Sequence, residues 1–157
     1  MYVIMDNELM NNFGVRYLIV GDYDNAIKEF EKEGGISYLG FMHFYGIGTK
    51  VDYAKAWEEV HYIRQDSYTG DDIWDIRMYN ILSKFIAGKM LYNGIYVEKD
   101  IKKGLWLFKS IADDWKIEET IANTYAFKML IEDFEDRDAQ YLFGLLDFYR
   151  GKYKEYR

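Results

Sequence analysis

Cysteine and proline are absent from this chain of 157 residues. Without cysteine, the protein has neither a disulfide framework nor a cysteine-based zinc site. Without proline, glycine and aspartate must mark the ends of helices. Only two histidines are present, so little material exists for a metal centre, and we expect neither a metal nor another cofactor.

Long apolar runs and a targeting signal are missing as well. The apolar runs are only a few residues long, far below the roughly 20 residues that cross a membrane. Residues 1–12 show no basic stretch followed by an apolar core, which a secretory signal would have. We therefore expect a cytoplasmic protein with no membrane partner.

Basic residues are scarce in the first half of the chain. Residues 1–78 hold 7 basic and 14 acidic residues, whereas residues 79–157 hold 13 of each. A nucleic-acid-binding protein would have a basic face instead, so we expect no nucleic-acid partner. The acidic half either attracts a basic protein partner or is simply a solvated surface.

Apolar residues are abundant and recur at helical spacing. The spacing predicts helices over roughly residues 7–20, 22–33, 37–45, 52–65, 72–92, 100–115, 118–134 and 136–149. No segment alternates convincingly between apolar and polar residues, as a half-buried strand would. The pattern thus predicts an all-α chain of about eight helices joined by short turns.

An internal repeat organises the glycines. When Gly40 is aligned with Gly88, 48 residues later, the pairs Gly46–Gly94, Asp52–Asp100 and Lys55–Lys103 coincide. We expect Gly40 to allow close packing of two helices, Gly46 to leave the first helix with a positive φ, and Asp52 to cap the second. A weaker third copy places Ala139, Phe143 and Gly144 in register.

This spacing resembles the Sel1-like repeat, a relative of the tetratricopeptide repeat with the approximate pattern A-x-x-x-L-G-x-x-Y-x-x-G-x-G-V-x-x-D-x-x-K-A. The first copy matches at Leu39, Gly40, Gly46, Gly48, Asp52, Lys55 and Ala56, and the second at Gly88, Gly94, Val97, Asp100 and Lys103. His43 and Thr49 depart from the pattern in the first copy, and Ala87, Tyr96 and Gly104 in the second.

The resemblance implies a short α-solenoid of antiparallel helix pairs within a single domain, residues 1–157. Its units would be a tetratricopeptide-like unit at 14–33, Sel1-like repeats at 35–66 and 83–115, and degenerate C-terminal helices at 117–157. The resemblance also implies a non-enzymatic protein-binding role. Sel1-like proteins look like adaptors and scaffolds, and some small bacterial members are immunity proteins that neutralise delivered toxins. The resemblance therefore implies that this chain is a small bacterial immunity protein that binds and neutralises a toxin. The alternative is a regulatory adaptor or scaffold that binds another protein.

A remoter alternative is an enzyme. Glu58 and His61 form an E-x-x-H pair on one helix face, which could belong to a hydrolase or to half of a two-metal site. No nucleophile motif accompanies the pair. The glycines of residues 46–48 lack the lysine and serine or threonine of a phosphate loop, so they do not predict a nucleotide site.

The aromatic residues divide between core and surface. We expect five aromatic residues to be buried in the core: Trp57, Trp106, Phe108, Phe127 and Phe134. The many tyrosines exceed what such a core needs, and exposed aromatic side chains favour a recognition surface.

The predicted binding surface is the insert between the repeats, RQDSYTGDDIWD at residues 64–75. Inserts between repeats tend to form loops that carry function. The predicted contact residues are two aromatic anchors and three acidic residues: Tyr68, Trp74, Asp71, Asp72 and Asp75. The competing interpretation makes Trp74 the first core residue of the helix that follows.

Overall fold

The computed structural model describes residues 13–33, 35–65, 72–76, 81–118, 121–142 and 144. These residues form seven labelled helices and a two-stranded sheet. The helices are α2 (Phe13–Ile19), α3 (Tyr23–Glu33), α4 (Ile36–Tyr45), α5 (Tyr53–Val60), α6 (Ile81–Asn93), α7 (Ile101–Glu118) and α8 (Ile121–Glu132), and the strands are β1 (His61–Gln65) and β2 (Asp72–Ile76). A further helical segment covers residues 137–142.

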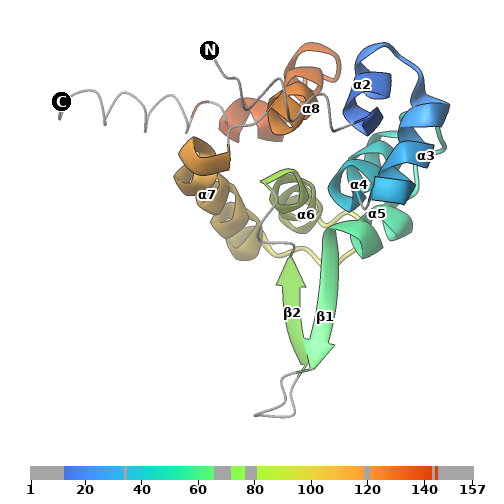
Figure 1. The fold of residues 1–157 in the computed structure, drawn as a ribbon. Helices are drawn as coiled ribbons and strands as arrows, with labels where there is room; N and C mark the ends of the chain where they lie inside the picture. The colour runs from blue at the N-terminus through green and yellow to red at the C-terminus, as the bar shows by residue number, and fades with distance from the viewer. Residues whose placement is uncertain are drawn as a thin grey trace.

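Helices that follow one another in the sequence pack as pairs. The pairs are α2 with α3, α4 with α5, and α6 with α7, and the last two are joined through a contact between α4 and α6. Figure 1 shows the remaining helices arranged around α4 and α6. The predicted α-solenoid of antiparallel helix pairs is thus confirmed for the helical part of the chain.

The core is centred on α4 and α6. Residues 37–44 of α4 and 81–88 of α6 are buried without interruption, which is typical of a helix covered on all sides. By contrast, α5 buries only Ala56, Trp57 and Val60, a single stripe that faces the core. The first helix of each repeat is therefore internal, and the second helix lies outside it.

The turns that join the helices of the two repeats are nearly identical. Gly46 and Gly94 both have a φ of +68°, the left-handed region that glycine enters without a Cβ clash. The amides of Asp52 and Asp100 donate to carbonyl oxygens of the preceding helix, both at 2.8 Å. Their side chains each accept the amide hydrogen of the residue three positions later, at 3.0 Å. The predicted roles of the turn glycine and the capping aspartate are confirmed.

Close approach of the paired helices is confirmed at Gly40. An ideal Cβ built on Gly40 would lie 2.5 Å from Cγ1 of Val60 on α5. An equivalent atom on Gly88 would lie 2.9 Å from the Phe108 ring on α7. Any larger side chain would therefore push the two helices of a pair apart.

The chain is all-α as predicted apart from strands β1 and β2, which replace the helices predicted for residues 61–65 and 72–76. The predicted helix over 52–65 ends at Val60, and the helix predicted to begin at residue 72 begins at Ile81. Both strands are rich in isoleucine and aromatic residues, which fit a pleated surface better than a helix. Because neither strand alternates regularly in polarity, pairing between the two strands decides the structure rather than a pattern within either one.

Two predicted core aromatics are exposed. Trp106 on α7 has 54% of its surface accessible and Phe134 has 37%. The Phe134 ring stacks on the Tyr45 ring, with the two ring centroids 4.7 Å apart. By contrast, Trp57, Phe108 and Phe127 are buried as predicted. Helix α7 turns its Leu107–Phe108 side to α6, and Trp106 lies outside that contact.

Candidate protein-binding site

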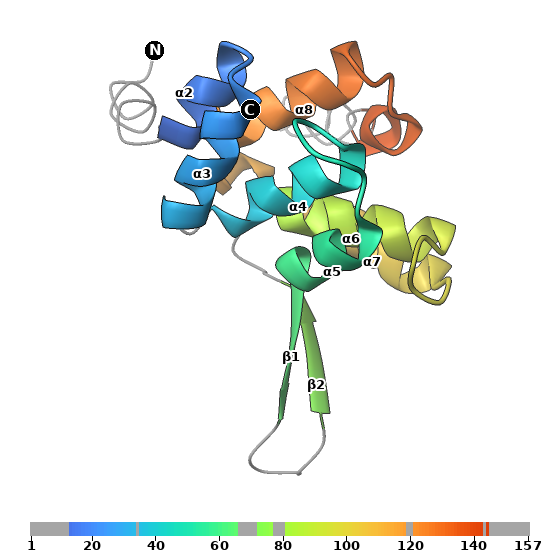
Figure 2. The ribbon, with the colours of Figure 1, turned by 90° about the vertical axis from the view of Figure 1, so that its right-hand side faces the viewer.

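The hairpin projects away from the helical body (Figure 2). Strand β1 continues directly from the end of α5, and β2 precedes α6. The strands are antiparallel, with Cα partners running from His61–Ile76 at the root to Gln65–Asp72 further out. Strands β1 and β2 thus form a ribbon that stands outside the helical body.

The structure places three of the five predicted contact residues on β2. Asp72 lies opposite Gln65, Trp74 opposite Ile63, and Asp75 opposite Tyr62.

The remaining two predicted contact residues, Tyr68 and Asp71, lie outside the described residues. The interpretation that Trp74 opens a helix is wrong, because α6 begins at Ile81. Trp74 therefore belongs to the projecting hairpin and not to the following helix.

The root of the hairpin is fixed to α5. His61 is the C-cap residue of α5 and the first residue of β1. Its ring stacks on Trp57 with centroids 4.2 Å apart, and its Nδ1–H donates to the Trp57 carbonyl oxygen. Partial burial lowers the pKa of His61, so the neutral ring is favoured there.

The structure places Glu58 and His61, the two residues of the E-x-x-H pair, in different environments. Glu58 is exposed, while the His61 ring is committed to Trp57. Within the described part of the chain, no cluster of three or more histidine, cysteine or acidic residues could hold a metal ion. His61 therefore acts in the structure as the link between α5 and the hairpin.

The other histidine forms a contact that sequence reasoning missed. His43 Nδ1 on α4 lies 2.5 Å from Glu59 Oε1 on α5, and both side chains are largely buried. Burial raises the pKa of Glu59, while the hydrogen bond to His43 opposes that rise. The only signal in the sequence is that His43 replaces the tyrosine of the repeat pattern.

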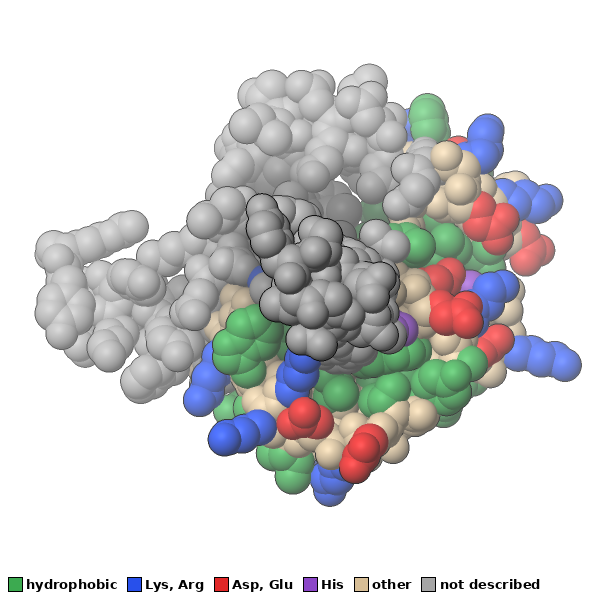
Figure 3. Space-filling model, turned by 90° about the horizontal axis from the view of Figure 1, so that it is seen from below, with side chains coloured by type: hydrophobic (Ala, Val, Ile, Leu, Met, Phe, Trp, Pro, Cys, Tyr) green, Lys and Arg blue, Asp and Glu red, His purple; other side chains and the backbone are tan. Residues whose placement is uncertain are grey.

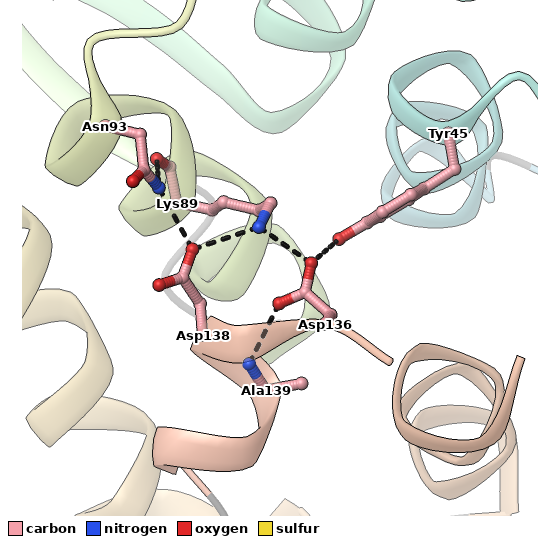
Figure 4. Close-up of polar contacts among 6 residues, drawn as sticks. All are labelled: Tyr45, Lys89, Asn93, Asp136, Asp138 and Ala139. Atoms are coloured by element: carbon pink, nitrogen blue, oxygen red, sulfur yellow. Dashed lines mark hydrogen bonds and ion pairs between the residues drawn. The ribbon is translucent and has the colours of Figure 1, made fainter. Parts of the chain in front are cut away.

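An ionic network joins the segment that contains Asp136 and Asp138 to helices α4 and α6 (Figure 4). Lys89 Nζ on α6 lies 2.7 Å from Asp136 Oδ2 and 3.0 Å from Asp138 Oδ2. Tyr45 of α4 donates its hydroxyl to Asp136 at 2.7 Å. Asn93 donates its side-chain amide to Asp138 at 3.0 Å. The network as a whole thus joins α4, α6 and the segment that begins at Asp136.

Asp136 also has a local task in this network. Its Oδ1 accepts the amide hydrogen of Ala139 at 3.0 Å and so caps the helical segment 137–142. The carboxylates raise the pKa of Lys89 against the opposing effect of its burial. Burial, followed by the Asp136 charge, raises the pKa of Tyr45. Each of these groups is thus held by at least one polar contact within the network.

Comparison with known families supports the internal repeat. Residues 35–58 and 83–114 match the family model of the Sel1 repeat. Both segments are similar to the Sel1 repeat. The first Sel1 repeat spans α4 and most of α5, and the second spans most of α6 and α7, so the hairpin lies in the interval between them.

Sel1 repeats are typically protein–protein interaction modules and generally not enzymes. No curated protein and no solved structure is similar enough to the chain to count as a match. Among the described residues, no helix combines the length and the apolar character needed to cross a membrane.

Proposed function

We propose that this chain is a non-enzymatic binding module whose β1–β2 hairpin contacts a basic protein toxin and neutralises it. The observation that carries the proposal is the position of the hairpin, which projects from the body between two Sel1 repeats. Loops and inserts on a rigid scaffold are where binding residues concentrate. A stacked root at Trp57 and His61 supports the ribbon and limits the entropy lost on binding.

The charge of the hairpin supports a basic partner. Residues 61–76 contain Arg64 as their one lysine or arginine, together with four aspartates. Opposite charge on a toxin would raise the association rate and make it dependent on salt, because the screening length is about 8 Å at physiological ionic strength. Trp74 supplies the aromatic area that interface hot spots favour.

The test uses the product of the neighbouring gene as the probe. Co-expression of that protein with this chain should restore growth if the pair is a toxin and its immunity protein. The triple change Asp71→Asn, Asp72→Asn and Asp75→Asn should slow association, and Trp74→Ala should speed dissociation, both measured by surface plasmon resonance. A matched control changes three exposed acidic residues elsewhere: Glu31→Gln, Glu132→Gln and Asp133→Asn.

The results separate the proposal from its alternatives. Rescue that survives both hairpin variants would remove the hairpin as the contact surface. Binding without rescue of growth would favour the regulatory adaptor, which uses the same kind of surface for another target. The proposal also places the chain in the cytoplasm of its host, which cell fractionation checks.

A further inference from the structure

The second Sel1 repeat has a surface feature that the repeat fold does not require. Trp106 on α7 is more than half exposed, whereas the equivalent residue of the first repeat, 48 positions earlier, is Glu58. Because the first repeat forms the same helix pair with a charged residue at this position, the tryptophan is not needed for folding. An exposed tryptophan is a common anchor in protein interfaces.

Trp106 borders a shallow hollow at the start of α7. The hollow is lined by Asp100, Lys102, Lys103 and Trp106 and has a volume of about 550 Å³. Lys102 and Lys103 precede Trp106 by four and three residues, so all three lie on one face of the helix. An apolar ring and two ammonium groups therefore border the same space.

Lysines outnumber acidic residues in the segment that borders the hollow, although the protein is acidic overall. Residues 98–109 hold four lysines and two acidic residues, against a formal net charge of −7 for the whole chain. One of those acids, Asp100, is engaged as the cap of α7 through the amide of Lys103. The positive end of the 18-residue helix α7 adds to the local potential. Carboxylates are the groups that this environment attracts.

The residue types favour carboxylates over phosphates. No arginine occurs between Met78 and Asp136, although arginine is the side chain that recognises phosphate through two parallel hydrogen bonds. Lysines act as point charges and suit a single carboxylate each. Trp106 adds an apolar platform that an acidic peptide with an aromatic residue would use and that a phosphate would not.

We infer that the hollow formed by Lys102, Lys103 and Trp106 binds an acidic segment of a protein partner. An aromatic side chain of that segment packs on Trp106, and a flanking carboxylate contacts the exposed Lys102. The surface lies on the outer helix of the second repeat and does not include the hairpin. It is therefore a second contact site, with the opposite charge preference.

The probe is a labelled peptide, acetyl-Glu-Glu-Phe-Glu-Glu-amide, titrated with the full chain and followed by fluorescence anisotropy. Binding should weaken as salt is raised. Trp106→Ala and Lys102→Glu should each weaken it about tenfold or more, in the range of an interface anchor. Lys28→Glu, an exposed lysine on α3, is the matched control and should bind as the parent does. Circular dichroism should show Trp106→Ala to be folded.

Two other ligands distinguish the sources of negative charge. Phosphatidylserine vesicles and a single-stranded oligonucleotide are titrated in the same way. If either binds in a Trp106-dependent manner and the acidic peptide does not, the inference is wrong. Equal peptide binding by the parent, Trp106→Ala and Lys102→Glu would also overturn it, as would no binding at all. The hairpin variants should bind the peptide normally, so this test is independent of the proposed function.

Discussion

In both Sel1 repeats, the first helix ends on a left-handed glycine and the second begins after a capping aspartate. Gly46 and Gly94 share a φ of +68°, and Asp52 and Asp100 make the same two hydrogen bonds at the same lengths. Around these joints, however, the residues differ. Phe41 of the first repeat becomes Lys89, Ala56 becomes Gly104, Gly48 becomes Tyr96 and His61 becomes Lys109.

The difference separates what the helix pair needs from what each repeat adds. The two joints share two residues with a positive φ, of which only the first is glycine in both, together with one small residue at the crossing and one cap. Positions outside this set are free to differ, and there the second repeat has gained an ion pair, a tighter crossing and an exposed tryptophan. The first repeat is followed by the hairpin instead. Each of these features can be altered separately by mutation.

The largest effect is expected at Lys89, where the second repeat has an ion pair and the first has Phe41, a fully buried ring. Lys89→Met should lower the free energy of unfolding by about 4 kcal/mol, because it leaves the Asp136 carboxylate, whose side chain is only 5% exposed, without its cation. Chemical denaturation measures the change. The double variant Lys89→Met with Asp136→Asn should recover part of the loss; no recovery would show that the pair is not the cause.

The tighter crossing of the second repeat is tested at Gly104. An ideal Cβ there would lie 2.9 Å from the carbonyl oxygen of Gly88, a backbone atom that cannot move aside. Gly104→Val should therefore cost about 3 kcal/mol of stability. The control is Gly144→Ala, since Gly144 is exposed and has no described atom within 4 Å of an added Cβ. Equal melting temperatures for the two variants would contradict the role of the crossing.

The turn position occupied by Gly48 and Tyr96 allows a reciprocal change. Both residues have a positive φ, of 70° and 65°, but an ideal Cβ on Gly48 would lie 2.4 Å from Tyr23 Cβ, while Tyr96 is largely exposed. Gly48→Ala should destabilise by about 2 kcal/mol, and Tyr96→Gly should stabilise by up to about 1 kcal/mol through relief of backbone strain. Thermal melts of both variants check the signs, and a destabilising Tyr96→Gly would refute the argument.

The smallest effect concerns the hairpin root, which only the first repeat has. The lowered pKa of His61 means that the folded state binds its proton less readily than the unfolded state. This contribution to stability is complete above the unfolded pKa of about 6.5 and declines as the pH falls through the folded value. The protection factors of the β1 amides, which compare the observed exchange rate with the intrinsic rate at the same pH, should fall between pH 7 and 5. His61→Gln should remove this fall in protection; an unaltered pH response would assign it elsewhere.

Local sequence determined the helix pairs, their joints and their caps. A glycine that must have a positive φ, or an aspartate that accepts the amide hydrogen three residues later, acts within a few residues of itself, so the repeat spacing located Gly46, Gly94, Asp52 and Asp100 correctly. The match of residues 35–58 and 83–114 to the Sel1 repeat rests on the same short-range spacing.

The tertiary structure decided what depends on residues distant in the chain. Strands β1 and β2 form because each supplies the other's hydrogen bonds, which neither segment's own polarity pattern predicts. Lys89 and Asp136 meet across 47 positions, and His43 and Glu59 meet only once α4 and α5 are packed. Helical spacing fixed the face of α7 on which Trp106 lies, but which face turns to α6 was settled by the packing of Leu107 and Phe108. Burial and pairing are properties of the assembled chain.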